Sequence, residues 1–190
     1  MTTVSAVSVP GLSALSGTYA LDTTHTRIGF TARHAMVTKV RGAFNEFEGT
    51  ATLDFDDVAR STASVTISAA SIDTRQAQRD AHLRSNDFLA MDEFPTIVFT
   101  STAARQTGDA EFELDGDLTV RGVTRPVTIP FSFEGTAKDP YGNTRVGFEG
   151  SVVINRKDFG VSYNAALETG GVLISDKVTL EFEVSAVKTA

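Results

Sequence analysis

The chain has 190 residues, a formal net charge of −7 and no cysteine. This length suits one domain with a hydrophobic core. The absence of cysteine excludes disulfide bonds, thiolate zinc sites and cysteine nucleophiles. The acidic balance argues against a nucleic-acid partner and against an electrostatic anchor on anionic lipid.

Residues 1–16 are mostly small and polar and include Pro10 and Gly11. They predict a flexible N-terminal tail in front of one domain over residues 17–188. No apolar run approaches the roughly 20 residues that span a bilayer. Because the first residues lack the basic and apolar regions of a signal peptide, we expect a cytoplasmic protein. A removed leader, and with it a periplasmic or secreted protein, stays open.

From residue 18 onward, apolar and polar residues alternate, as in antiparallel strands with one dry and one wet face. In one such run Ile28, Phe30, Ala32 and His34 share a face. The predicted strands lie near 18–22, 26–34, 43–56, 62–72, 96–107, 110–135 (two strands joined by a turn), 144–155 and 172–187.

One segment departs from this alternation. Asp73-Thr74-Arg75-Gln76 resembles a capping box, with Asp73 as the N-cap. The residues that follow include no β-branched side chain, and Asp80 and Arg84 are spaced for an i,i+4 pair. The sequence therefore predicts one short helix near residues 76–86. Overall we expect an all-β fold, an antiparallel barrel of about eight strands closed to remove its edges, with a sandwich as the alternative.

Four short strings, in order along residues 17 to about 187, resemble the YceI family of polyisoprenoid-binding, lipocalin-like proteins. The strings are Asp22-x-x-His25-Thr26-x-x-x-Phe30-x-x-x-His34 with Gly42-x-Phe44, His82-Leu83-Arg84-Ser85-x-Asp87-Phe88, Leu118 to Val127, and Arg156-x-Asp158-Phe159-Gly160. The resemblance implies an extended lipocalin-like barrel with a helix near one end and a long isoprenoid or fatty chain inside it. It permits a homodimer. No cofactor is predicted.

The chain contains 13 phenylalanines and no tryptophan. Inward phenylalanines are either a packed core or, given the resemblance, the wall of an apolar tunnel. Each buried ligand CH₂ contributes about 0.8 kcal/mol, so a long chain would need little help from its head group. The predicted apolar ligand-binding residues are Ile28, Phe30, Phe44, Phe47, Phe99, Phe131, Phe133 and Phe148.

Two polar residues are predicted to meet the polar end of the ligand. His34 shares the inward face of Phe30, and Arg84 follows the predicted helix. The alternative for Arg84 is a structural ion pair with Asp87 that fixes the helix to the barrel. The Arg156-x-Asp158 string has the same two interpretations.

No catalytic or metal-binding residue is predicted. The spacing of His25, His34 and His82 matches no compact zinc motif. The chain has no G-x-S-x-G, G-x-G-x-x-G or phosphate-binding loop motif. We therefore expect a lipid carrier or store that is not an enzyme. The alternatives are a lipocalin-like isomerase or cyclase acting on a lipid-like substrate and a purely structural or interaction domain.

Overall fold

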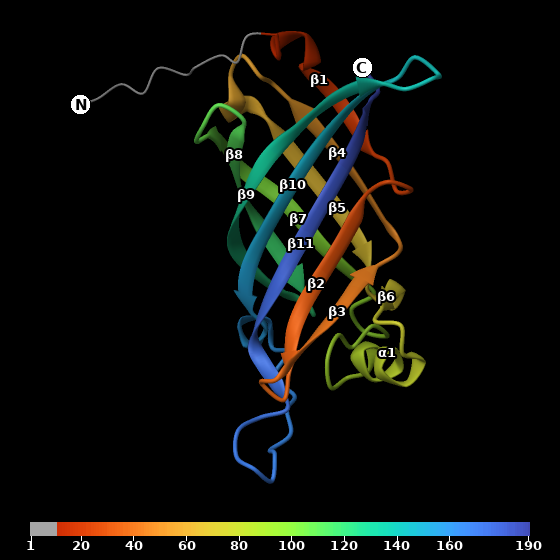
Figure 1. Cartoon of the computed structure of the whole chain (residues 1–190), viewed down its shortest axis with the longest axis vertical. Helices are drawn as coiled ribbons and strands as arrows, with labels where there is room; N and C mark the ends of the chain where they lie inside the picture. The colour runs from red at the N-terminus through yellow and green to blue at the C-terminus, as the bar shows by residue number, and fades with distance from the viewer. Residues whose placement is uncertain (1–10) are drawn as a thin grey trace, which may run out of the picture.

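The computed structural model describes residues 11–190 as an elongated antiparallel β-barrel with one α-helix beside its lower end (Figure 1). The helix is α1 (Ala77–Arg84). Short 3-10 helices are η1 (Ser13–Leu15), η2 (Val58–Arg60), η3 (Ala69–Ser71) and η4 (Arg156–Phe159). The strands are β1 (Gly17–Leu21), β2 (Arg27–His34), β3 (Thr38–Phe44), β4 (Phe47–Leu53), β5 (Thr62–Ser68), β6 (Ile72–Asp73), β7 (Thr96–Gln106), β8 (Glu111–Val120), β9 (Val123–Lys138), β10 (Thr144–Asn155) and β11 (Ile174–Lys188).

The sheet closes because β1 pairs with β4 on one side and with β11 on the other. The last strand, β11, pairs with β2 from Ile174 to Glu183 and then with β1 from Ala186 to Lys188. Strands β1 and β2 are therefore two halves of one barrel strand, bent at residues 22–26. Strands β3 and β4 form a second such strand. The predicted fold class, an antiparallel barrel of eight strands with one helix, is confirmed.

The predicted strand over residues 43–56 is wrong at its beginning. Here the chain forms two strands, β3 and β4, and the first of them starts at Thr38. Apart from Val40, the stretch from Thr38 to Gly42 is polar or glycine, so alternation gives a weak signal for a strand there.

The helix is confirmed, but its predicted cap is wrong. Gln76 is the N-cap, and its side chain accepts a hydrogen bond from the Arg79 N–H. Asp73 instead belongs to β6, and its carboxylate accepts from the Arg75 N–H at 2.8 Å. The expected Asp80–Arg84 pair is also wrong. Asp80 is buried and accepts from the Thr74 N–H at 2.8 Å, which ties the start of the helix to β6.

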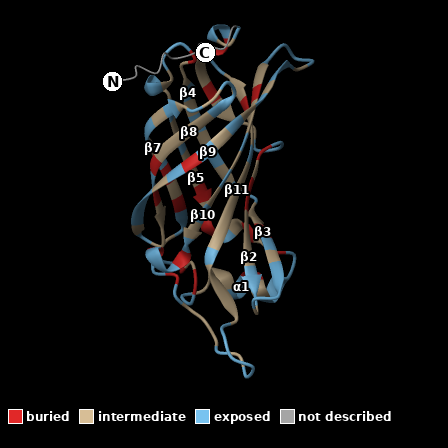
Figure 2. Ribbon diagram, turned by 60° about the vertical axis from the view of Figure 1, so that its left-hand side comes forward, coloured by how far each residue is buried: buried red, intermediate tan, exposed pale blue. Residues whose placement is uncertain are grey.

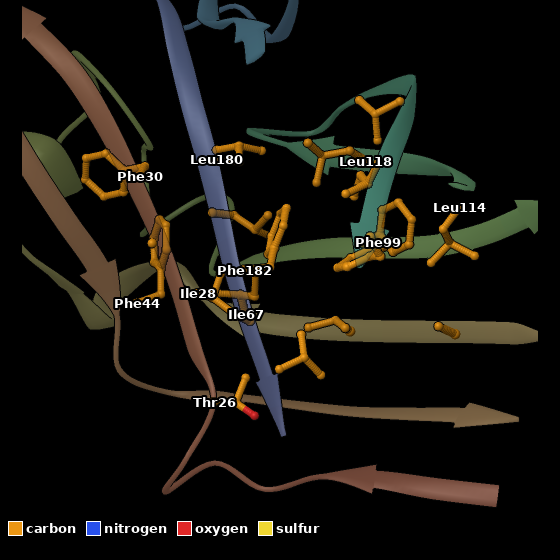
Figure 3. A pocket seen from close by; sticks show the side chains of 18 of the residues that line it. Thr26, Ile28, Phe30, Phe44, Ile67, Phe99, Leu114, Leu118, Leu180 and Phe182 are labelled. Carbon is orange, nitrogen blue, oxygen red and sulfur yellow. The ribbon is translucent and has the colours of Figure 1, made fainter. Parts of the chain in front are cut away.

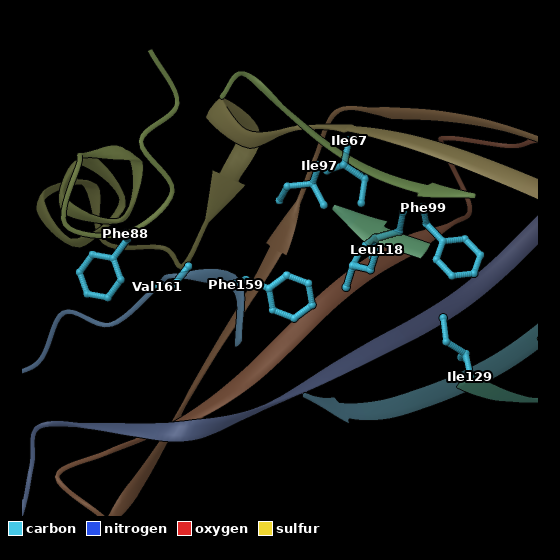
Figure 4. Packing of buried hydrophobic residues seen from close by; sticks show 9 residues of the cluster. Ile67, Phe88, Ile97, Phe99, Leu118, Ile129, Phe159 and Val161 are labelled. Atoms are coloured by element: carbon cyan, nitrogen blue, oxygen red, sulfur yellow. The ribbon is translucent and has the colours of Figure 1, made fainter. Parts of the chain in front are cut away.

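Two apolar clusters pack inside the barrel, and we call the one that includes residues of β1 the upper cluster and the one that includes Phe88 after α1 the lower cluster. Figure 2 shows buried segments at several levels of the barrel. The upper cluster comprises Leu15, Tyr19, Phe55, Val146 and Ala186. The lower cluster comprises Ile28, Ile67, Phe88, Ile97, Phe99, Leu118, Ile129, Phe159 and Val161, most of which are labelled in Figure 4.

The predicted N-terminal tail does not extend to residue 16. Leu15 is buried in the upper cluster, and its carbonyl accepts a hydrogen bond from the fully buried Tyr19 hydroxyl at 2.6 Å. Ser16 Oγ accepts from the Phe55 N–H at 2.9 Å. This segment closes the upper end of the barrel. The rest of the predicted tail, residues 1–10, lies outside the described residues.

Candidate functional site

A cavity of about 360 Å³ lies inside the barrel, lined by all the residues of the lower cluster and by Tyr19, Phe55 and Ala186 of the upper cluster. The size falls within the usual range of small-molecule pockets. Its wall is built by side chains from strands all around the barrel, and Figure 3 shows phenylalanine, leucine and isoleucine side chains gathered around it. An almost purely hydrocarbon wall attracts apolar ligands and offers few groups for hydrogen bonding.

Six of the ten predicted ligand-binding residues line this cavity. They are Ile28, Phe30, Phe44, Phe99, Phe131 and Phe148. The sequence-based list omitted other lining residues that follow the same alternation, such as Leu180 and Phe182 on β11. Phe182 lies 6.0 Å from Phe131, measured between ring centroids. The same period-two signal could have identified both.

Two predicted phenylalanines lie inside the barrel but not on the cavity wall. Phe133 packs on the upper cluster, with its ring centroid 6.0 Å from that of Phe55 and 5.4 Å from that of Phe148. Phe47 packs against the lower cluster. Both pack inside the barrel, and their contact with a ligand stays a prediction.

The expected position of His34 is wrong. His34 is the last residue of β2 and is exposed, so it meets neither the cavity nor the ring of Phe30. It continues the alternation of the strand at the lower end of the barrel, where its side chain is exposed. It is paired with Ile174 at the beginning of β11.

Arg84 lies outside the cavity and fixes the helix through backbone groups. Its guanidinium donates to the Ala70 carbonyl at 2.8 Å and to the Ile72 carbonyl at 3.2 Å. The structural interpretation is therefore the better one, but the predicted partner is wrong, because Asp87 contacts His82 at 2.8 Å instead. The head-group contact expected for Arg84 has no support in this geometry.

Arg156 is the buried cation next to the cavity. Its guanidinium donates to the carbonyls of Ser175, Val161 and Tyr163 at 2.7–2.9 Å. One of its terminal nitrogens has no hydrogen-bond partner in the described residues and lies 4.0 Å from Asp176 Oδ1. Burial lowers the pKa of Arg156 from its ordinary value, and the charge of Asp176 opposes this effect. These contacts make Arg156 a brace for the segment after η4.

The lower end of the cavity is closed by α1 and by the segments around residues 88 and 161. Leu83, Phe88 and Leu89 line the cavity together with Phe159 and Val161. The ring of Phe88 is also part of a three-ring contact on the side away from the cavity. Its centroid lies 5.0 Å from that of His82 and 5.2 Å from that of Tyr163. Aromatic packing of this kind holds the lower closure together.

Glycines let three phenylalanine rings lie flat against the wall. A Cβ atom at Gly42 would lie 2.4 Å from the Phe30 ring, one at Gly116 2.3 Å from the Phe99 ring, and one at Gly150 2.6 Å from the Phe131 ring. Because these positions have no side chain, the rings cover the neighbouring strand and leave the centre of the barrel open.

Comparison with known proteins identifies the family. The model of the YceI-like domain matches residues 19–186. The chain belongs to the YceI family. It is 40% identical to protein YceI of Shigella flexneri over 151 residues, which cover 78% of each chain. It is 38% identical to a UPF0312 protein of Ectopseudomonas mendocina, with 87% of this chain and 88% of that protein covered.

Several solved structures have the same fold. A Campylobacter jejuni YceI protein matches with a TM-score of 0.72 at 26% identity, over 83% of this chain and 90% of that one. Burkholderia cenocepacia BcnA matches with a TM-score of 0.77 at 22% identity, over 87% and 98%. A polyisoprenoid binding domain from Saccharophagus degradans matches with a TM-score of 0.68 at 13% identity, over 90% and 98%.

Within residues 11–190, no helix combines the length and the apolar character that crossing a bilayer requires. The cytoplasmic location expected from the N-terminal sequence stays a prediction, since residues 1–10 lie outside the described residues.

Proposed function

We propose that this protein binds one long-chain isoprenoid or a related amphipathic lipid inside its barrel and carries or stores it. The observation that supports it best is the cavity of about 360 Å³ inside the barrel, with its hydrocarbon wall. Membership of the YceI family and the likeness to a structure described as a polyisoprenoid binding domain support the choice of ligand class.

The energetics of this site depend on the chain of the ligand. Each buried methylene group contributes about 0.8 kcal/mol, so ten buried carbons contribute roughly 8 kcal/mol before the cost of ordering. A single methylene more or less therefore changes the dissociation constant only about fourfold. We therefore expect a preference for long apolar chains and little discrimination among them.

Several polar groups of the cavity wall are already bonded within the protein, although one buried terminal nitrogen of Arg156 has no hydrogen-bond partner in residues 11–190. Thr26 Oγ1 donates to the Ser185 carbonyl at 2.9 Å, and Asp54 Oδ1 accepts from the N–H groups of Asp56 and Asp57. A polar head inside the cavity would find few free partners and would lose its hydration. We therefore propose that only the apolar chain enters and that the head group stays at one end of the barrel.

Mass spectrometry of an organic extract tests this function. Protein purified without detergent should release a long-chain lipid in nearly one-to-one amount, and the emptied protein should take up a fluorescent polyprenyl probe. An empty extract together with no uptake of the probe would refute the proposal. Incubating the extracted lipid with emptied protein separates carrier from enzyme, because a carrier returns it chemically unchanged.

Phe131→Asp is the matching variant. A carboxylate in the dry cavity costs several kcal/mol unless it is paired, so this variant should lose the bound lipid. Val153→Asp is its control, because Val153 is 57% exposed on the neighbouring strand β10 and places the same charge outside. Equal lipid retention by the two folded variants would contradict a ligand next to Phe131.

A further inference from the structure

The turn between β2 and β3 exposes apolar side chains at the lower end of the barrel. Met36 is 59% and Val37 is 77% exposed. The turn is joined to the loop of residues 163–173, because the Ala35 N–H donates to the Leu173 carbonyl at 2.7 Å. On that loop Val172 is 40% exposed. Figure 1 shows both segments at the end opposite the chain termini.

Basic residues flank this apolar tip. The segment from Thr23 to Asn45 contains Arg27, Arg33, Lys39 and Arg41 and no acidic residue, within a chain of net charge −7. Arg33, Lys39 and Arg41 are exposed, and in residues 11–190 none of them forms an ion pair with a carboxylate. We call Met36, Val37 and Val172 with these three basic residues the lower rim.

The backbone of this turn is strained, because two residues other than glycine have positive φ. Ala35 has a φ of 51° and Met36 a φ of 61°, and the Val37 N–H donates to the His34 carbonyl at 3.0 Å. A turn with two central residues of positive φ strongly favours Asn-Gly, and other residues cost roughly 1–2 kcal/mol each. The Ala35-Met36 pair therefore makes this turn less stable than an Asn-Gly pair, which is also more polar, would make it.

The lower rim is continuous with the cavity. On β2 the cavity-lining residues run as far as Ala32, two residues before the end of the strand. Ile174, which also lines the cavity, is paired with His34 at the base of the turn. A surface that binds at the rim would thus lie next to the lower end of the lipid site.

We infer that the lower rim docks on the surface of an anionic lipid bilayer, with Met36 and Val37 inserted among the lipids and the basic residues on the head groups. Interfacial binding needs this combination of apolar insertion and positive charge. The net charge of −7 does not oppose it, because charges beyond about 8–10 Å are largely screened at physiological salt. Near the rim, Glu168 lies on the 163–173 loop, and Asp176 is paired with Lys157 at 3.2 Å.

Vesicle flotation tests the docking. The protein should float with vesicles of equimolar phosphatidylcholine and phosphatidylglycerol, much less with phosphatidylcholine alone, and less at high salt. Lys39→Gln and Arg41→Gln should each weaken the binding about fivefold. Tyr141→Ser is the control, because Tyr141 is 89% exposed in the β9–β10 hairpin at the other end and should leave the binding unchanged.

A double variant, Ala35→Asn with Met36→Gly, separates docking from folding. It relieves the turn, so Tm should stay equal or rise, while binding to the anionic vesicles should fall about tenfold through the lost apolar contact. No flotation of the native protein, or an equal loss in Tyr141→Ser, would overturn the inference. A dimer in light scattering, together with no vesicle binding, would also overturn it, because the tip would then join two copies of the chain.

This inference adds a lipid surface to the proposed function, and the two can fail separately. The Phe131→Asp variant keeps the lower rim and should still float with anionic vesicles after losing its cavity lipid. If the native protein yields a bound lipid but does not float, the docking is refuted and the lipid cavity stands. If it floats but yields no lipid and takes up no probe, the cavity proposal is refuted instead.

Discussion

At the scale of single residues, the volume of the cavity depends on pairs of glycine and phenylalanine. Phe30 and Gly42 are direct cross-strand partners on β2 and β3, and Phe131 and Gly150 are partners on β9 and β10. In each pair the ring occupies the space above the glycine, so it lies along the wall. A larger residue in place of the glycine would push the ring toward the centre.

The variant Gly42→Ala tests this arrangement. Its Cβ would lie 2.4 Å from the Phe30 ring, so the ring must swing into the cavity. We expect weaker binding of a long-chain probe and a stability loss of about 1–3 kcal/mol from overpacking. Probe titration and urea unfolding measure the two effects. Gly147→Ala is the control, because its Cβ would meet nothing closer than 3.8 Å, and it should bind the probe normally.

The sequence predicts whether a side chain points into or out of the barrel better than it predicts the position of the residue along the barrel axis. Alternation correctly placed Phe30 and Phe131 toward the inside. It placed His34 and Phe133 there by the same logic, yet His34 is exposed at the lower end of the barrel, while Phe133 packs inside at the level of the upper cluster. The level of a residue depends on strand tilt and stagger, which are properties of the closed barrel and not of one strand.

At the scale of elements, an ion-pair network holds the bent strand β1–β2 to the β9–β10 hairpin. Asp22 at the bend contacts His25 at 2.6 Å and accepts a hydrogen bond from Arg145 on β10. Arg145 also donates to Asp139 in the hairpin at 3.0 Å. Burial would raise the pKa of Asp22, but the hydrogen bonds from His25, Arg145 and the Thr24 N–H outweigh it and lower the pKa to about 2.

This network predicts a loss of stability in acid. A carboxylate whose pKa is lower in the folded state stabilises the protein at any pH above its unfolded-state pKa. For Asp22 this stabilisation disappears as the pH falls from about 3.8 to about 2. We expect Asp22 to contribute on the order of 1 kcal/mol after solvent screening, equivalent to about 2–4 °C in Tm. The Tm difference between the native protein and Asp22→Asn should shrink over that pH range. A constant difference would contradict the prediction.

The elements themselves were largely predictable, whereas their junctions were not. Period-two alternation located strands such as β7 and β10 within a residue of their observed ends. The capping box at Asp73 was misplaced because Asp73 pairs with Ala43 in the sheet. The left-handed Arg75, with a φ of 64°, separates β6 from the helix, so the cap falls to Gln76. Such a choice depends on a tertiary contact that local sequence does not encode.

At the scale of the whole molecule, charge and apolar surface are separated in space. The cavity wall is hydrocarbon, while three exposed basic residues without ion pairs in residues 11–190, Arg33, Lys39 and Arg41, lie together on the β2–β3 hairpin at the lower end of the barrel. The net charge of −7 argued against binding to an anionic lipid surface. The net charge is a sum over the whole chain, so it does not show that basic residues lie together on one hairpin. The two proposed lipid contacts, one inside and one at the rim, therefore depend on different forces.

This separation predicts different responses to salt. A ligand that binds only the folded protein stabilises it by about 2.7 kcal/mol at a free concentration roughly 100 times its Kd, equivalent to about 5–10 °C in Tm. Because the cavity contact is apolar, this Tm rise should be the same at low and at high sodium chloride. Vesicle binding by the same protein should weaken markedly over that range, since salt screens the basic rim. A Tm rise that disappears with salt would instead indicate that the head group of the ligand is held by charged residues.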